Sequence, residues 1–169
     1  METNSVDFFK SIENNLTAPE NTLIIAVWEI MNPGNAGQII RLGHNVGANK
    51  VLFIGDENKF RKSKIKKTAG FSFDQMNWEF ISEEQFFSTA KNDFSLVALE
   101  TCAGSKNIFR QELPEKVILL AGNESAGIPP HVIEKSSLKV YIPMPGDCKS
   151  MNVSHALSVA SFEWYRQKS

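Results

Sequence analysis

Four short apolar runs constrain the fold more than any other feature of the sequence. They span Leu23–Trp28, Val51–Ile54, Phe94–Leu99 and Val117–Ala121. A strand that is apolar along nearly its whole length is typical of a sheet covered on both faces, because neither face meets water. Segments with helical periodicity alternate with these runs. The sequence therefore predicts an α/β fold, with a mostly parallel sheet and helices on both faces.

Length and composition indicate one globular domain. The chain has 169 residues, of which 42% are hydrophobic and 22% charged. This length can bury a sizeable core but is short of two ordinary domains, and the composition excludes large-scale disorder. We expect a single domain over residues 1–169, with residues 1–20 as an N-terminal helical extension. The extension contains an amphipathic pattern from Val6 to Leu16.

The sequence lacks the usual features of secreted, membrane and metal-binding proteins. No run approaches the ~18 consecutive apolar residues of a membrane-spanning helix. The N-terminal METNSVDFF has neither the basic start nor the apolar centre of a secretory signal. Cys102 and Cys148 are far apart and have no histidine ligands nearby, so we expect no disulfide framework and no structural metal. We expect a cytoplasmic protein.

Local patterns predict several helices between the strands. Ala36–Val46 has helical spacing and is followed by Gly47 as a terminator. Ser82–Gln85 matches a capping box, which should open a helix that runs to Ala90. Two prolines at 129 and 130 favour a short helix toward Glu134. For Ala69–Trp78 the pattern favours no regular structure.

The stretch Val140–Gln167 combines a strand, a loop and a long helix. Val140–Ile142 is β-rich, and the Pro-Gly loop at 143–146 prevents either a strand or a helix from continuing. Asn152 is a good N-cap for the helix that follows. One face of that helix holds the apolar residues Val153, Leu157, Ala160 and Trp164, and another holds the small residues Ser154, Ser158 and Ser161.

Three loops with unusual composition each follow an apolar strand. They are Asn32–Gly37, Gly122–Gly127 and Pro143–Asn152. Because the carboxyl ends of parallel strands meet at one edge of a sheet, these loops should lie together where α/β proteins bind ligands. Each loop alone is most often a turn, whereas the three together predict one composite site.

These loops carry a family resemblance. Asn35, Gly37 and Arg41 form the pattern NxGxxxR, LAGNESAGI follows at 120–128 and IPMPGDCKSMNVSHA at 142–156. The three segments resemble, in order, the signature motifs of the SpoU branch of the SPOUT RNA methyltransferases. The resemblance implies a deep trefoil knot at the C-terminal end, which is an exception to the unknotted rule. It also implies a homodimer that uses S-adenosylmethionine to methylate the 2′-hydroxyl of an RNA ribose, with tRNA favoured over rRNA.

The resemblance also assigns a cofactor pocket. The residues that correspond to its lining are Leu99, Glu100, Gly122, Ile142, Met144 and Met151. The family usually has leucine where this chain has Met151, a substitution that conserves volume and keeps the pocket apolar.

The predicted catalytic residues are Asn35, Arg41, Glu124, Ser150 and Asn152. Asn35, Ser150 and Asn152 offer short polar groups that can hold a ribose hydroxyl in line with the methyl group. For Ser150 and Asn152 the alternative is helix capping. Glu124 either orients the substrate or a neighbouring loop, or is a solvated turn carboxylate. In the family the arginine is proposed to activate the hydroxyl, but a guanidinium is a poor proton acceptor, so we assign Arg41 to an RNA phosphate.

A basic segment is the candidate for contact with the RNA backbone. Although the net charge is −1, six cations lie between 59 and 67, namely Lys59, Arg61, Lys62, Lys64, Lys66 and Lys67. The alternative is a solvated loop. Nearby Phe60, Phe71, Phe73 and Trp78 either stack on bases or, for most of them, pack in the core. His44, His131 and His155 are interpreted as structural or surface residues.

Two other functions stay open on the sequence alone. One is a non-catalytic knotted RNA-binding or assembly protein, against which the intact Asn35, Arg41, Ser150 and Asn152 argue. The other is an ordinary nucleotide-binding α/β enzyme, which is disfavoured because the chain lacks both the GxGxxG and the GxxxxGK[ST] fingerprints.

Overall fold

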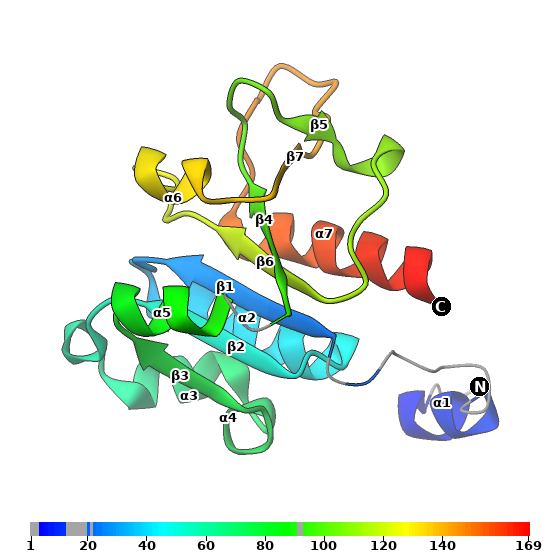
Figure 1. The fold of residues 1–169 in the computed structure, drawn as a ribbon. Helices are drawn as coiled ribbons and strands as arrows, with labels where there is room; N and C mark the ends of the chain where they lie inside the picture. Colours follow the sequence, from blue (N-terminus) through cyan, green and yellow to red (C-terminus); the bar gives the residue numbers. More distant parts are fainter. Residues whose placement is uncertain (1–3, 13–19, 21, 91–92) are drawn as a thin grey trace.

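A single parallel sheet organises the structure. The computed structural model describes residues 4–12, 20, 22–90 and 93–169 (Figure 1). Within these ranges seven strands pair in the order β3-β2-β1-β6-β4-β7-β5, and every pair is parallel. The strands are β1 (Leu23–Trp28), β2 (Lys50–Ile54), β3 (Trp78–Ile81), β4 (Ser95–Leu99), β5 (Lys106–Asn107), β6 (Val117–Ala121) and β7 (Leu138–Tyr141). The predicted α/β class is confirmed.

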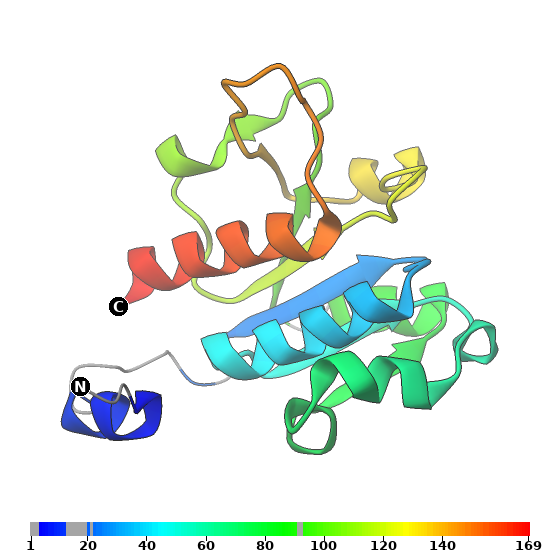
Figure 2. The same cartoon turned by 180° about the vertical axis from the view of Figure 1, so that it is seen from behind.

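Helices cover both faces of the sheet. They are α1 (Ser5–Ile12), α2 (Pro33–Val46), α3 (Lys62–Ala69), α4 (Ser72–Gln75), α5 (Glu83–Ala90), α6 (Pro130–Glu134) and α7 (Val153–Lys168), with short 3-10 turns η2 (Glu57–Lys59) and η3 (Ile108–Arg110). One core layer packs α2, α3 and α7 against the sheet, and a second packs α5 and α6 on the opposite face (Figures 1 and 2). No residue of α1 is buried. No helix in the described part of the chain is long and apolar enough to cross a bilayer.

The central strands form where the sequence leaves no alternative to burial. All six residues of β1 and all five of β6 are buried, and the observed bounds match the predicted ones. Ile25 of β1 lies in register with Val51 of β2 on one side and with Leu119 of β6 on the other. Burial of about 1.5–3 kcal/mol per large apolar side chain makes these strands the main source of stability.

Helix α2 begins three residues earlier than predicted. Asn32 is its N-cap, with the side chain accepting a hydrogen bond from the Gly34 amide at 2.7 Å, and Pro33 occupies the first turn. The prediction that Asn32–Gly37 is a loop was therefore wrong beyond its first residue. A proline is tolerated in the first turn of a helix, because the backbone amide that it lacks would have no partner within the helix there. Gly47 ends the helix in the left-handed region at φ 71°, as predicted.

The other predicted caps are confirmed. Ser82 and Gln85 form a reciprocal capping box, with bonds of 2.8 Å and 3.2 Å, and α5 follows to Ala90. Asn152 caps α7 by accepting from the Ser154 amide at 2.9 Å. The predicted helix from Val6 to Leu16 is seen as α1 to Ile12, and its last residues lie outside the described ranges.

The segment from Lys59 to Ile81 differs most from what the sequence predicts. The basic stretch is not a solvated loop, because most of it forms α3, which buries Ile65 and Ala69. The unassigned stretch that follows contains α4 and leads into the edge strand β3. The short strand β5 was not predicted either.

Helix α7 buries both of its predicted faces. Val153, Leu157, Ala160 and Trp164 are buried, and Trp164 Nε1 lies 3.1 Å from the Pro114 carbonyl oxygen. The small-residue face is occupied within the chain as well, since Ser154 and Ser161 are 3% and 0% exposed. Ser154 Oγ lies 2.5 Å from Gln38 Oε1, which ties α7 to α2. Ser158 is half-buried, so the chain itself covers most of this face.

Candidate active site

The three segments singled out in the sequence, of which the first is the start of α2, meet at the carboxyl edge of the sheet. They follow β1, β6 and β7. Strands β1 and β6 are neighbours at the centre of the sheet, and β7 is separated from β6 by β4. One side chain from each is joined in a hydrogen-bonded chain: Asn35 Nδ2 donates to Glu124 Oε1 at 2.6 Å, and Asn152 Nδ2 donates to Asn35 Oδ1 at 3.1 Å. The predicted composite site is thus present.

This chain of hydrogen bonds fixes the orientation of the Asn35 amide. Asn35 is 8% exposed, and its oxygen and nitrogen each have a partner. The second carboxylate oxygen of Glu124 accepts from the Met31 amide at 3.2 Å, which holds the segment before α2. Asn152 caps α7 with Oδ1, which is the alternative role considered for it, and at the same time donates from Nδ2 to Asn35. Bonds to an ionised carboxylate are the stronger kind, so Glu124 is the anchor.

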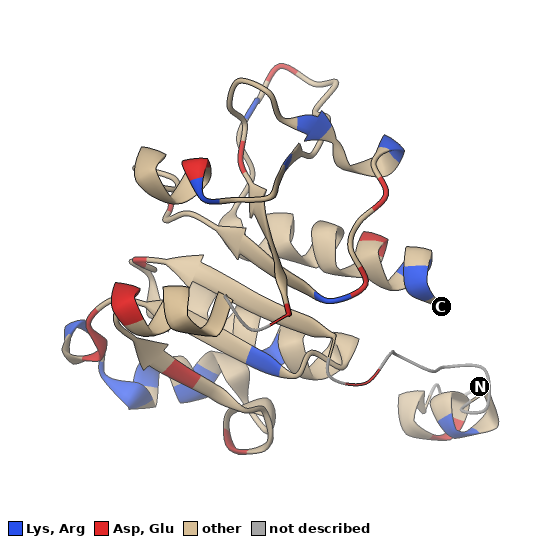
Figure 3. Cartoon of the chain, viewed as in Figure 1, with Lys and Arg blue, Asp and Glu red and all other residues tan. Residues whose placement is uncertain are grey.

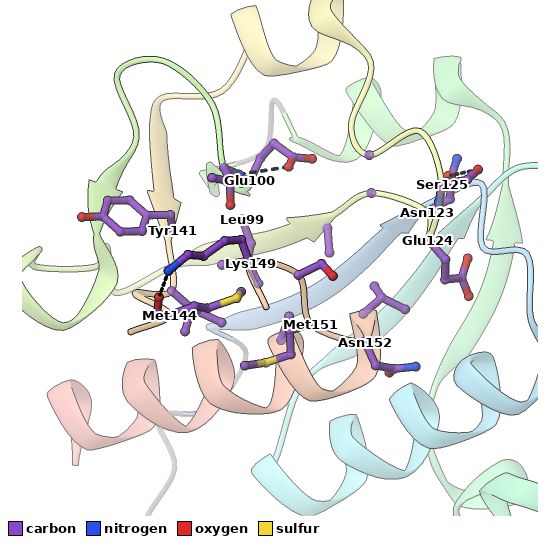
Figure 4. Close-up of a pocket in the computed structure, with 18 residues that line it drawn as sticks. Leu99, Glu100, Asn123, Glu124, Ser125, Tyr141, Met144, Lys149, Met151 and Asn152 are labelled. Carbon is purple, nitrogen blue, oxygen red and sulfur yellow. Dashed lines mark hydrogen bonds between the residues drawn. The ribbon is translucent and has the colours of Figure 1, made fainter. Parts of the chain in front are cut away.

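A cavity of ≈ 520 Å³ opens beside this network (Figure 4). Its volume lies in the range of small-molecule sites. All six residues predicted to line a cofactor pocket do line it, namely Leu99, Glu100, Gly122, Ile142, Met144 and Met151. Glu124, Ser150 and Asn152 line it as well. The structure therefore brings nine of the predicted residues around one space.

One wall of the cavity is a loop folded tightly on itself. A Cβ atom at Gly122 would lie 2.0 Å from the carbonyl carbon of Gly127, so only glycine fits there. Gly127 has φ 68°, which also favours glycine. The Glu100 carboxylate holds this loop by accepting from the amides of Thr101 at 2.9 Å and Ile128 at 3.0 Å. Backbone thus forms this wall, and Glu100 fixes it.

Lys149 is a residue of the cavity that sequence reasoning missed. It is the one lysine or arginine among the residues that line the cavity, and its Nζ donates to the Met144 carbonyl oxygen at 3.0 Å (Figure 4). Tyr141 and Thr101 were missed too. The one indication in the sequence was that Lys149 directly precedes Ser150. That its charge faces a ligand site becomes clear only when the cavity is seen.

Arg41 is the one predicted catalytic residue that stands apart. It lies on α2 about 9 Å along the helix axis from Asn35, by the rise per residue. Its side chain is exposed, does not line the cavity, and makes no hydrogen bond or ion pair with another residue of the described ranges. The guanidinium is therefore available to a partner that approaches over α2.

The basic segment places its six cations, all exposed, along η2, the turn that follows it and α3, where Figure 3 shows lysine and arginine next to acidic positions. Lys62 and Lys66 are 3.3 Å and 2.8 Å from Glu57 and Asp74. The other four cations, Lys59, Arg61, Lys64 and Lys67, have no ion-pair partner in the described part of the chain. Helix α3 packs closely against α2, which carries Asn35 and Arg41. The charged surface and the site therefore belong to adjacent elements.

Three of the four nearby aromatic residues pack against the core, as favoured. Phe60 stacks on Phe80 at 5.8 Å between ring centroids, and Phe73 contacts Trp78 at 5.0 Å. The Trp78 indole donates to the Phe73 carbonyl oxygen at 2.9 Å. Phe71 is different, because its residue is 75% exposed.

Known proteins are similar to this chain in sequence and in fold. The chain is 27% identical over 164 residues to a tRNA (guanosine(18)-2′-O)-methyltransferase of Aquifex aeolicus, covering 94% of this chain and 76% of that protein. It is 30% identical over 155 residues to a tRNA (cytidine(34)-2′-O)-methyltransferase of Yersinia pestis, covering 86% and 93%. The crystal structure of an AdoMet-bound rRNA methyltransferase from Sinorhizobium meliloti superposes with a TM-score of 0.78 at 25% identity, and the match covers 90% of this chain and 59% of that one.

The fold and the composite site define an α/β RNA methyltransferase that uses S-adenosylmethionine. Residues 22–162 match the sequence model of the SpoU rRNA Methylase family. The chain belongs to that family, and the predicted resemblance is confirmed.

Proposed function

We propose that this protein transfers a methyl group from S-adenosylmethionine to the 2′-hydroxyl of a ribose in tRNA. The observation that carries the proposal is the Asn35–Glu124–Asn152 network at the edge of the cavity. Among the relatives compared, those covered by this chain over 76% or 93% of their own length are all named as tRNA methyltransferases. Two relatives named as 23S rRNA methyltransferases are covered over 59% and 66%, as is one tRNA methyltransferase over 66%. The best-covered relatives therefore favour tRNA over rRNA.

The cavity suits a nucleoside cofactor with an amino acid end. Gly122 and Gly127 line the cavity with backbone, against which a planar base can lie, and Leu99, Ile142 and Met151 give apolar surface. S-Adenosylmethionine supplies an electrophilic methyl group on a sulfonium. Glu100 acts by holding the wall, because both of its oxygens already accept backbone amides. Lys149 is available for a carboxylate, since its present partner is a neutral carbonyl.

Asn35, Ser150 and Asn152 position the ribose hydroxyl. The Asn35 amide is held in one orientation, and each of its polar atoms keeps one further hydrogen-bonding capacity. The Ser150 residue is exposed at the cavity. Holding the hydroxyl in line with the methyl group is the main source of acceleration in a direct displacement, and such positioning supplies as much as ~7–11 kcal/mol. Glu124 contributes by fixing Asn35.

Arg41 binds an RNA phosphate in this proposal. Its exposed and unpaired guanidinium matches the bidentate geometry of a phosphate. A guanidinium does not accept a proton near neutral pH, so the hydroxyl proton leaves to the phosphate or to water. The basic segment at Lys59–Lys67 adds contacts to the backbone that do not depend on sequence.

Three further features belong to the same proposal. The protein acts as a homodimer, its C-terminal segment forms the trefoil knot, and it works in the cytoplasm as a single domain. What supports them is membership of the SpoU family and the resemblance of the three motifs. Light scattering of the purified protein tests the dimer, and a monomeric mass would contradict it.

The test of the proposed function is transfer of labelled methyl from S-adenosylmethionine to separated tRNA and rRNA. Wild type is compared with Asn35→Ala and Arg41→Ala, and with Asn45→Ala as a control, because Asn45 is an exposed residue of the same helix. We expect label in tRNA that both site variants lose and the control keeps. Absence of S-adenosylmethionine binding, together with absence of label in any RNA fraction, would instead favour the non-catalytic RNA-binding alternative.

A further inference from the structure

Phe71 is an exposed aromatic residue whose ring is held in place. It lies between α3 and α4 and is 75% exposed. One side of the ring faces the His44 imidazole, with centroids 5.9 Å apart and planes 33° apart. His44 Nδ1 is 3.0 Å from Ser72 Oγ, and Ser72 is 6% exposed. The chain thus fixes an aromatic pair while leaving much of the Phe71 surface open to solvent.

The surroundings of this pair are cationic. Between residues 56 and 74 the chain has six lysine and arginine residues against three carboxylates, although its net charge is −1. Phe71 follows directly on α3, and Arg41 lies one turn before His44 on α2. A planar apolar surface beside unpaired cations fits the two parts of a nucleotide, since a base stacks on the ring and the phosphate meets the cations.

The distance along α2 determines which nucleotide the pair would meet. His44 is nine residues from Asn35, which is about 13 Å along the helix axis. The pair therefore lies too far from the cavity to contact the methylated ribose. Because His44 contacts Phe71 and Ser72, the pair lies on the side of α2 that packs against α3 and α4.

We propose that Phe71, backed by His44, is a stacking platform for an unpaired base that flanks the methylated nucleotide. The inference rests on the proposed function, because it takes RNA as the substrate. Every base has an aromatic face, so the platform tolerates different bases and selects unpaired over paired ones. The substrate region is thus single-stranded RNA, as in a loop.

The first test is RNA binding without turnover. The probes are a fluorescent RNA hairpin with a single-stranded loop and a fully paired duplex of the same length, both in excess S-adenosylhomocysteine. Phe71→Ala should weaken binding of the hairpin by about 5- to 150-fold and leave the affinity for the duplex unchanged. Phe71→Trp should keep the affinity. Phe109→Ala is the matched control, because Phe109 is 48% exposed and lies next to β5, at the opposite sheet edge from β3.

The salt dependence separates stacking from charge. Phe71→Ala should lower the affinity by the same factor at every salt concentration, because no counterion is released. Lys64→Ala should instead reduce the slope of log K against log salt by about 1. A changed slope for Phe71→Ala, or equal affinity of wild type and Phe71→Ala for the hairpin, would overturn the inference.

A contact between protein copies is the competing role for the Phe71 ring. If Phe71→Ala changes the mass of the protein in sedimentation, the ring contacts a second copy and the platform is refuted. Failure of the proposed function shows itself separately, as absence of methyl transfer to any RNA. If hairpin binding still needs Phe71 in that case, the platform stands in a non-catalytic RNA-binding protein, whereas absence of all RNA binding refutes both.

Discussion

Gly122→Ala should disrupt the cavity through a clash that no side-chain movement relieves. The added Cβ would lie 2.0 Å from the Gly127 carbonyl carbon and 2.3 Å from the Ile128 nitrogen, and both are backbone atoms. Carbon atoms in contact prefer about 3.5–4.0 Å, so the 122–128 loop must move by more than ~1 Å. Overpacking of this kind costs about 1–3 kcal/mol. The movement strains the 3.0 Å bond from the Ile128 amide to Glu100 and displaces Glu124.

Calorimetric titration with S-adenosylhomocysteine measures this effect. We expect the Kd of Gly122→Ala to rise about 5- to 150-fold, the factor that corresponds to about 1–3 kcal/mol. Gly146→Ala is the matched control, because a Cβ there meets nothing within 4 Å and the residue lies in the third loop. We expect its Kd to be unchanged. Equal affinity of Gly122→Ala and wild type would refute the reasoning that this loop forms the wall of the cofactor site.

Three further predictions concern charged residues. Glu124→Gln weakens the hydrogen bond that orients Asn35, so kcat should fall about 10- to 100-fold in steady-state methyl transfer while the Kd of S-adenosylhomocysteine stays constant. An unchanged kcat would contradict the positioning role of Glu124. Lys149→Met should lower the affinity for S-adenosylhomocysteine about 5-fold, which is the effect of losing an exposed ion pair. The affinity for 5′-methylthioadenosine, which lacks the carboxylate, should not change. Equal losses of affinity for both ligands would show that Lys149 shapes the cavity instead. Hydrogen bonds from Arg166 lower the pKa of Glu163 from its ordinary 4.5, so this carboxylate stabilises the fold above the unfolded pKa and ceases to do so as pH falls through the folded pKa. The difference in unfolding free energy between wild type and Glu163→Gln should therefore become smaller in acid, as urea denaturation at several pH values can measure. A difference that becomes larger in acid would contradict this pH dependence.

The central sheet and the helix caps could be predicted from the sequence because single interactions determine them. Strands β1 and β6 are apolar throughout, so burial is their one stable environment. Asn152, Gly47 and the Ser82–Gln85 box satisfy backbone groups at helix ends through their own side chains or conformations. Such signals are local and do not depend on the rest of the fold.

The elements that were missed depend on tertiary contacts. Helix α3 has few apolar residues and is stabilised by packing Ile65 and Ala69 against its neighbours. The edge strand β3 has only Ile81 buried, so its sequence carries little strand signal. The sequence shows the small-residue face of α7 but not what packs on it, and in the structure the chain itself covers Ser154 and Ser161.

The site shows the same division. The three loops could be placed at one sheet edge from strand order alone, yet the residues of the cavity came from the motif resemblance and not from periodicity. The hydrogen bonds among Asn35, Glu124 and Asn152 join positions 89 and 117 residues apart, which no local pattern can indicate. Lys149 is found only once the cavity is seen, and only its exposure separates Phe71 from the three neighbouring aromatic residues that pack in the core.

The most direct test of the central claim is the chemical position of the transferred methyl group. The protein is incubated with tRNA and S-adenosylmethionine that carries a trideuterated methyl, and the RNA is digested to nucleosides for mass spectrometry. We predict a 2′-O-methylnucleoside whose added mass stays with the ribose fragment, and no such product with Asn35→Ala. Deuterated methyl found on a base, or an unchanged yield from Asn35→Ala, would contradict the proposed site and its chemistry.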